Sequence, residues 1–128
     1  MNIVPVDKHD LDSIEQLNKA SNEELTPYLP ELIEWVQDIN WPVAFGVAER
    51  LRNCGNEIVP HIKNVLAKDD NVFKYNVLAH IVSHLNTECI ELLLDELTRI
   101  KEKPTEGEIE EEVTLVANNA IGVLKFNA

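Results

Sequence analysis

Two tryptophans on either side of an aspartate form the first candidate site. Trp35, Asp38 and Trp41 lie within the stretch EWVQDINWP (34–42), although only 5% of the chain is aromatic. The set could be a catalytic aspartate framed by two indoles. The indoles could equally be core packing, because Trp buries a large apolar surface. The sequence leaves both interpretations open.

A second candidate is a small polar-ligand or catalytic site. One lysine and three carboxylates could supply it: Lys74, Asp38, Glu106 and Glu108. Such a site requires these side chains to converge in a concave pocket, whereas a flat surface would favour protein binding.

Metal binding has one local signal. His80 and His84 are four residues apart, which places them on one face of a helix and could provide half of a zinc site. No third ligand follows at local spacing and no HExxH motif occurs, so we interpret the pair as a polar helix flank and expect no metal.

Other catalytic motifs are absent from the sequence. There is no serine nucleophile motif, and the four glycines are too scattered to form a phosphate loop or a dinucleotide fingerprint. Cys54 and Cys89 fall within helical patterns, so we expect two buried free thiols in a reducing compartment. We therefore expect no cofactor.

The elements that must position these residues are helices. Apolar residues recur at a period of 3.6, as in Ala44, Val47, Ala48 and Leu51, and no period-two alternation indicates a strand. Pro27 and Pro30 mark a place where the second helix could break. The predicted helices span 8–20, 22–37, 41–54, 57–67, 71–85, 87–102 and 107–125.

Two of these helix pairs are related by an internal repeat. Sliding the segment 41–66 by 31 residues places Leu51 on Val82 and Ile62 on Leu93, and it preserves the pattern of apolar, small and turn positions. The repeat resembles HEAT-like repeats. We predict an all-α, HEAT-like α-α superhelix of three and a half stacked, right-handed hairpins. It forms a single domain over 1–128, with flexible ends at 1–7 and 126–128.

The repeat also predicts where the candidate residues meet. The N-termini of helices 41–54, 71–85 and 107–125 should line up along one edge, roughly 10 Å apart. The alternative is ordinary helix capping by the carboxylates, with Trp41 filling a gap between hairpins. The predicted binding residues on and beside this edge are Trp35, Asp38, Asn40, Trp41, Phe73, Lys74, Tyr75, Thr105, Glu106 and Glu108.

Charge limits the partners that this edge could bind. The chain carries 23 acidic and 11 basic residues, for a net charge of −12. HEAT-like alkylpurine DNA glycosylases use tryptophans and an aspartate, as in Trp35, Asp38 and Trp41, but they hold duplex DNA in a basic groove. We therefore keep a glycosylase as a remote alternative and expect no nucleic-acid partner.

Three segments resemble a family of small bacterial domains of unknown function, DUF5071. They are LPELIEWVQDINWPVA (29–44), VPHIKNVLAKDDNVFKYNVL (59–78) and PTEGEIEEEV (104–113), and the match extends from about Asp10 to Ala120. The family pattern contains WxxDxNWP, an aromatic-Lys-Tyr block and PTxxE, whereas His80 and His84 are not part of it. The resemblance implies an all-α, HEAT-like fold and no particular activity.

These observations favour a non-catalytic module that binds a protein or peptide, for example a bacterial immunity-type or adaptor protein with a basic partner. No segment approaches ~20 apolar residues and residues 1–10 lack a signal peptide, so we expect a cytoplasmic protein without a membrane partner, as a monomer or weak dimer. Whether the protein is an enzyme stays open, and we favour the interpretation that it is not.

Overall fold

The structure is a computed structural model that describes residues 3–127, with side chains to residue 125. Within this range the chain is all-α and contains no β-strand. Short 3₁₀ turns extend several helices: η1 (Thr26–Tyr28), η2 (Trp35–Gln37), η3 (Gly55–Ile58) and η4 (Val82–His84). The α-helices are α1 (Leu11–Lys19), α2 (Asn22–Leu25), α3 (Leu29–Glu34), α4 (Ala44–Leu51), α5 (Val59–Leu66), α6 (Asn71–His80), α7 (Thr87–Leu92), α8 (Leu94–Glu102), α9 (Glu106–Glu110) and α10 (Val113–Asn127).

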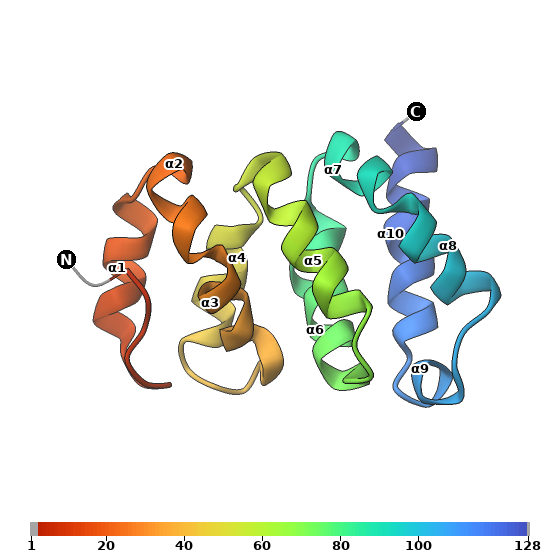
Figure 1. The fold of residues 1–128 in the computed structure, drawn as a ribbon, viewed down its shortest axis with the longest axis horizontal. Helices are drawn as coiled ribbons and strands as arrows, with labels where there is room; N and C mark the ends of the chain where they lie inside the picture. The colour runs from red at the N-terminus through yellow and green to blue at the C-terminus, as the bar shows by residue number, and fades with distance from the viewer. Residues whose placement is uncertain (1–2, 128) are drawn as a thin grey trace.

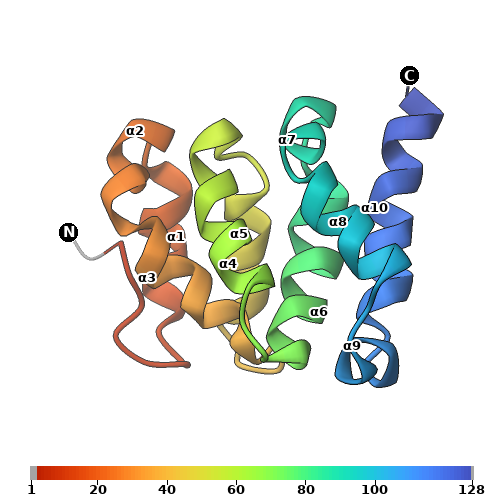
Figure 2. The same cartoon turned by 45° about the vertical axis from the view of Figure 1, so that its right-hand side comes forward.

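The helices form two layers of antiparallel hairpins (Figure 1). Helices α1, α4, α6 and α10 follow one another in the first layer, and α2–α3, α5 and α7–α8 form the second (Figure 2). Helix α10 closes the stack by packing on α6, α7 and α8. The predicted order of hairpins is therefore confirmed for the described residues, while right-handed superhelical coiling stays a prediction.

The core lies between the two layers and follows the predicted repeat. The pairs related by the 31-residue offset, Leu51 with Val82 and Ile62 with Leu93, are fully buried. Hydrogen bonds between hairpins also join residues about one repeat apart. The Asn22 side chain donates to the Asn53 carbonyl, 31 residues away, and Asn56 donates to Glu88, 32 residues away. Each hairpin therefore contacts its neighbours through equivalent positions.

The structure breaks several helices that periodicity predicted as continuous. The break at Pro27 to Pro30 was expected, but 87–102 is also divided at Leu93, and 107–125 at Glu111 and Glu112. The apolar stripe continues through the break at Leu93, since Ile90, Leu93 and Leu97 are all fully buried. Hydrophobic spacing alone therefore cannot reveal the change of helix direction.

The N-terminal segment packs against the first hairpins. Pro5 is buried, and the amide of Val43 donates to the carbonyl of Lys8. Helix α1 begins at Leu11 rather than residue 8, because the Asp10 side chain caps it by accepting from the Ser13 amide. We predicted flexible ends at 1–7 and 126–128. Residues 1–2 and 128 of these ends lie outside the described residues.

Candidate functional site

The three predicted turns lie on the same edge of the stack, at the bottom of Figure 1. The turn before α4, the start of α6 and helix α9 all reach this edge because α4, α6 and α10 run parallel in the first layer. We call it the N-terminal edge. Sequence reasoning therefore located the edge correctly, and the question becomes which of its side chains face outward.

The tryptophan turn is held by hydrogen bonds within its own sequence. The Asp38 carboxylate accepts from the Asn40 amide at 2.9 Å, and the Trp41 amide donates to the Asp38 carbonyl at 3.1 Å. The rings of Trp35 and Trp41 meet edge to face, with centroids 5.6 Å apart and an interplanar angle of 70°. Both indoles are half-buried. They pack on each other, which is a favourable aromatic geometry, and leave part of their surface open to a partner.

Asn76 anchors this turn to α6, the first helix of the third hairpin. Its side chain is buried and donates to the carbonyls of Val36 and Gln37, each at 3.1 Å. These bonds satisfy the carbonyls where η2 ends, so they fix the tryptophan turn against α6. Sequence reasoning did not identify Asn76. The available signal was a polar residue inside the apolar stripe between Phe73 and Val77.

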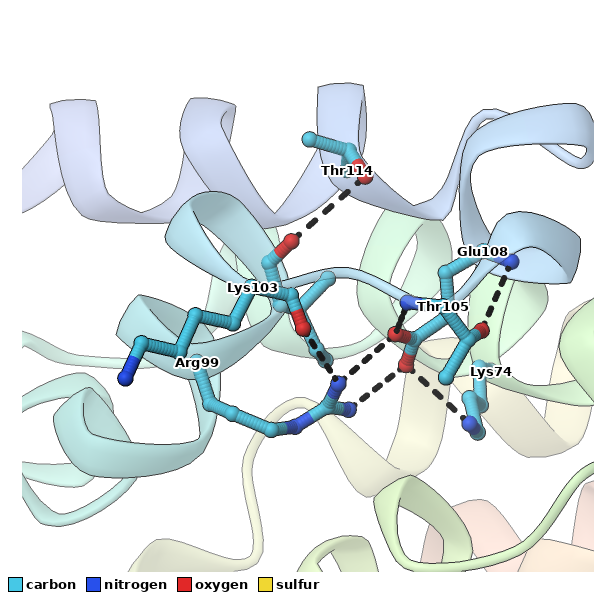
Figure 3. A network of polar contacts seen from close by, with 7 residues as sticks. Lys74, Arg99, Lys103, Thr105, Glu108 and Thr114 are labelled. Carbon is cyan, nitrogen blue, oxygen red and sulfur yellow. Dashed lines mark hydrogen bonds and ion pairs between the residues drawn. The ribbon is translucent and has the colours of Figure 1, made fainter.

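A buried ionic network joins α6, α8 and α9 (Figure 3). The side chain of Glu108 is 0% exposed and that of Lys74 is 4% exposed, and their charged atoms lie 3.1 Å apart. Arg99 binds the same carboxylate through two nitrogens at 2.7 and 2.6 Å. Glu108 and Thr105 also form a capping box, in which each side chain accepts from the other residue's amide.

This network keeps Glu108 ionised. Burial alone would raise the pKa of Glu108, but hydrogen bonds from Arg99, the Thr105 amide and Lys74 outweigh burial and lower it to about 2. The hydrogen bond with Glu108 also raises the pKa of Arg99. The carboxylate accepts from three groups, so its hydrogen bonds are used within the fold and it stays ionised at neutral pH.

The predicted binding residues therefore divide into two groups. Phe73, Lys74 and Glu108 point inward, and a partner at the surface does not reach them in this conformation. We assign them a structural role. The other seven keep some exposure at the N-terminal edge or beside it: Trp35, Asp38, Asn40, Trp41, Tyr75, Thr105 and Glu106.

The histidines and cysteines do not form a site. Burial, together with the positive charge of Arg52, lowers the pKa of both His80 and His84. No group of three or more His, Cys, Asp or Glu residues in the described part of the chain could hold a metal ion. Cys54 and Cys89 are buried free thiols, as predicted.

The fold and the tryptophan turn together describe the class of protein to which this chain belongs. The chain is an all-α protein of stacked helical hairpins that presents a tryptophan turn at one edge. The chain belongs to the family described as Domain of unknown function (DUF5071), whose model matches residues 3–121. No curated protein matches this chain. None of the helices in residues 3–127 has the length and apolar character needed to cross a bilayer.

Proposed function

We propose that this protein is a non-catalytic module that binds a basic protein or peptide through its N-terminal edge. The observation that carries the proposal is the half-buried pair of Trp35 and Trp41, which the Asn76 hydrogen bonds hold in place. Rigid aromatic side chains on a scaffold are the residues that most often dominate binding energy at interfaces. An immunity-type or adaptor protein in the bacterial cytoplasm fits this description.

The charge of the molecule supports a basic partner. The net charge is −12, and two carboxylates belong to the N-terminal edge: Asp38 within the tryptophan turn and Glu106 at the start of α9. Complementary charge speeds association and discriminates against acidic partners such as nucleic acids and anionic membranes. The same charge disfavours a DNA glycosylase, which requires a basic groove, and a strong dimer of two acidic copies.

The alternative function, a small polar-ligand or catalytic site, depends on a lysine that is not accessible at the surface. Lys74 was the cation expected to hold such a ligand, but its ammonium group is buried against Glu108. The neighbouring carboxylate of Asp38 already accepts from a backbone amide. We therefore rank this alternative below partner binding.

Affinity capture tests the proposal. We expect the wild-type protein, immobilised in native bacterial lysate, to retain a specific partner that mass spectrometry identifies. The variant Trp41→Ala should retain at least tenfold less of it, since hot-spot aromatic residues contribute roughly 2 kcal/mol or more.

The control is Tyr28→Ala, which removes another partly exposed aromatic ring outside the N-terminal edge. This variant should retain the partner at the wild-type level. The proposal is wrong if Trp41→Ala, shown to be folded by circular dichroism, captures as much partner as the wild type.

A further inference from the structure

The end of the stack carries a second surface, where α9 meets α10. Two large apolar side chains are exposed there, Ile109 at 59% and Leu115 at 55%. They line a surface pocket of about 440 Å³ together with Lys101, Glu112, Thr114 and Asn118. We call this pocket the α9–α10 groove.

A smaller pocket adjoins this groove on the side of α6. It has a volume of about 250 Å³ and is lined by Val72, Tyr75 and three consecutive glutamates, Glu110 to Glu112. Glu112 lines both pockets. The two pockets therefore adjoin at Glu112, and the smaller one reaches Tyr75, a residue at the N-terminal edge.

The groove depends on a break in the helix. In a continuous helix, Ile109 and Leu115 would be six residues apart and so roughly 120° apart around the axis. They line one pocket because the chain turns at Glu111 and Glu112 before α10 begins. Glu112 holds this turn with a φ of 61°, a left-handed conformation that is unfavourable for a residue with a side chain. The chain therefore adopts an unfavourable backbone conformation beside the pocket that the two apolar side chains line.

Ile109 and Leu115 do not take part in the core contacts that hold α10 in the stack. Val113, Ala117 and Ala120 are fully buried and pack toward the preceding hairpin, which accounts for the stability of α10 in the stack. Ile109 and Leu115 lie outside this core, and no other helix among residues 3–127 covers them. Exposed apolar groups with a polar border are typical of protein interaction sites.

Charge indicates what would cover them. Glu110, Glu111 and Glu112 are exposed, and none forms an ion pair within the described side chains. Lys101 is the single cation among the residues that line the two pockets, so carboxylates predominate. A second copy of this chain would bring another net charge of −12 to the same place, and a phosphate-rich surface would be repelled.

We propose that the α9–α10 groove binds a basic peptide segment of another protein. One bulky apolar side chain of the peptide lies between Ile109 and Leu115, and its Lys or Arg residues face Glu110 to Glu112. This inference rests on the proposed function, because it names the chemistry of the partner and extends the binding surface from the N-terminal edge to the end of the stack.

The test uses two synthetic amphipathic peptides of about 14 residues. One contains only Leu and Lys, and the other carries Glu in place of every Lys. We expect the Leu/Lys peptide to shift the amide resonances of residues 109–118 in ¹⁵N-labelled full-length protein, with no such shift from the Leu/Glu peptide. The variant Leu115→Ser should bind at least tenfold more weakly.

Matched variants separate this groove from unspecific attraction. Leu92→Ser changes an apolar residue on α7 that is 47% exposed, and it should bind within twofold of the wild type. The double variant Glu110→Gln/Glu111→Gln should weaken binding and reduce its dependence on salt. The double variant Glu23→Gln/Glu91→Gln, which removes two exposed carboxylates elsewhere, should do so much less.

Several results would overturn the proposal. They are the absence of Leu/Lys binding, equal binding by Leu115→Ser and the wild type, or resonance shifts confined to the Trp35–Trp41 turn. A dimer that Leu115→Ser abolishes would instead make a second copy the occupant.

If a partner is captured through Trp41 while the groove stays unperturbed by the peptide, only this inference fails. If the peptide binds the groove but Trp41→Ala captures normally, the proposed N-terminal edge fails and the groove stands.

Discussion

Glu108 shows how a residue that suggests chemistry by its type can be structural by its contacts. Its carboxylate accepts from Arg99, Lys74 and the Thr105 amide with no exposure to solvent. The sequence could predict the capping box, because Thr105 and Glu108 have the required spacing. It could not predict Lys74 and Arg99 as partners, because that pairing depends on how α6, α8 and α9 pack. The separation of 34 residues between Lys74 and Glu108 is close to one repeat, and this was the available clue.

Removing the Glu108 charge should destabilise the fold. Glu108→Gln leaves the buried Lys74 ammonium without its counter-ion, and breaking a buried pair in this way costs about 3 kcal/mol or more. Urea unfolding at pH 7 measures this loss. Glu106→Gln, an exposed neighbour on the same helix, is the control and should change the free energy of unfolding by less than about 0.5 kcal/mol.

The same carboxylate gives stability a defined dependence on pH. Its pKa is about 2 in the folded protein and near 4.5 in the unfolded chain. The contribution of Glu108 is therefore complete above pH 4.5 and is lost as the pH falls from 4.5 toward 2. Urea unfolding at several pH values in this window should show a steeper loss for wild type than for Glu108→Gln. Parallel curves would mean that folding does not lower the pKa of Glu108.

Replacing Glu112 should increase stability, in contrast to replacing Glu108, because the backbone conformation of Glu112 is unfavourable for a residue with a side chain. It occupies the position after the end of α9 where glycine is the usual residue, with a φ of 61°. Glu112→Gly should stabilise the protein by about 1 kcal/mol, measured by urea unfolding, since glycine adopts this conformation without steric cost. Glu111→Gly, at an ordinary negative φ, should destabilise it. A loss of stability in Glu112→Gly would show that the side chain makes contacts that outweigh the strain.

At the scale of elements, α9 approaches α6 closely because residue 107 is glycine. A Cβ atom at Gly107 would collide with the side-chain amide of Asn71, whose Oδ1 atom is buried without a hydrogen-bond partner. The contact explains why a glycine lies inside a short helix, where it otherwise lowers stability. The predicted helix 107–125 began at this glycine without a packing role for it, because the approach of α6 is not visible in the local sequence.

A pair of alanine substitutions tests this contact. Gly107→Ala should destabilise the protein by about 1 kcal/mol, whereas Gly122→Ala, with open space around the new methyl group, should stabilise it by roughly 0.5–1 kcal/mol. In an Asn71→Ala background the sign for Gly107→Ala should reverse, since only the helix preference remains. The measurement is the free energy of unfolding for the full cycle. Additive effects would show that Gly107 and Asn71 do not interact.

For the whole molecule, the repeat made the fold predictable. The hairpins pack on one another in chain order, so the 31-residue offset was enough to predict the order of the helices and the edge where their N-termini meet. The directions of individual side chains were not predictable. Phe73 and Lys74 appeared beside Tyr75 as one exposed block, but successive helical residues point in different directions, and the first two are buried.

The net charge of −12 also has a global effect on stability. Repulsion among exposed carboxylates opposes the compact state, and salt screens it. Raising NaCl from about 0.02 M to about 0.3 M, where the screening length falls well below 10 Å, should therefore increase the melting temperature by a few degrees. A matched concentration of a neutral osmolyte controls for solvent exclusion. A lower melting temperature in NaCl would mean that attraction within exposed ion pairs, such as Lys19–Glu15 and Lys68–Glu34, outweighs the overall repulsion.

The tryptophan turn gives the protein a localised optical reporter. Both indoles of the chain lie in one turn of the N-terminal half, with their centroids 5.6 Å apart. Their fluorescence reports on the junction between the first two hairpins, while circular dichroism averages over every helix. In a linear stack of hairpins, the two signals coincide during unfolding only if the whole stack melts together. Comparing the two curves therefore measures how far cooperativity extends from that turn toward α10.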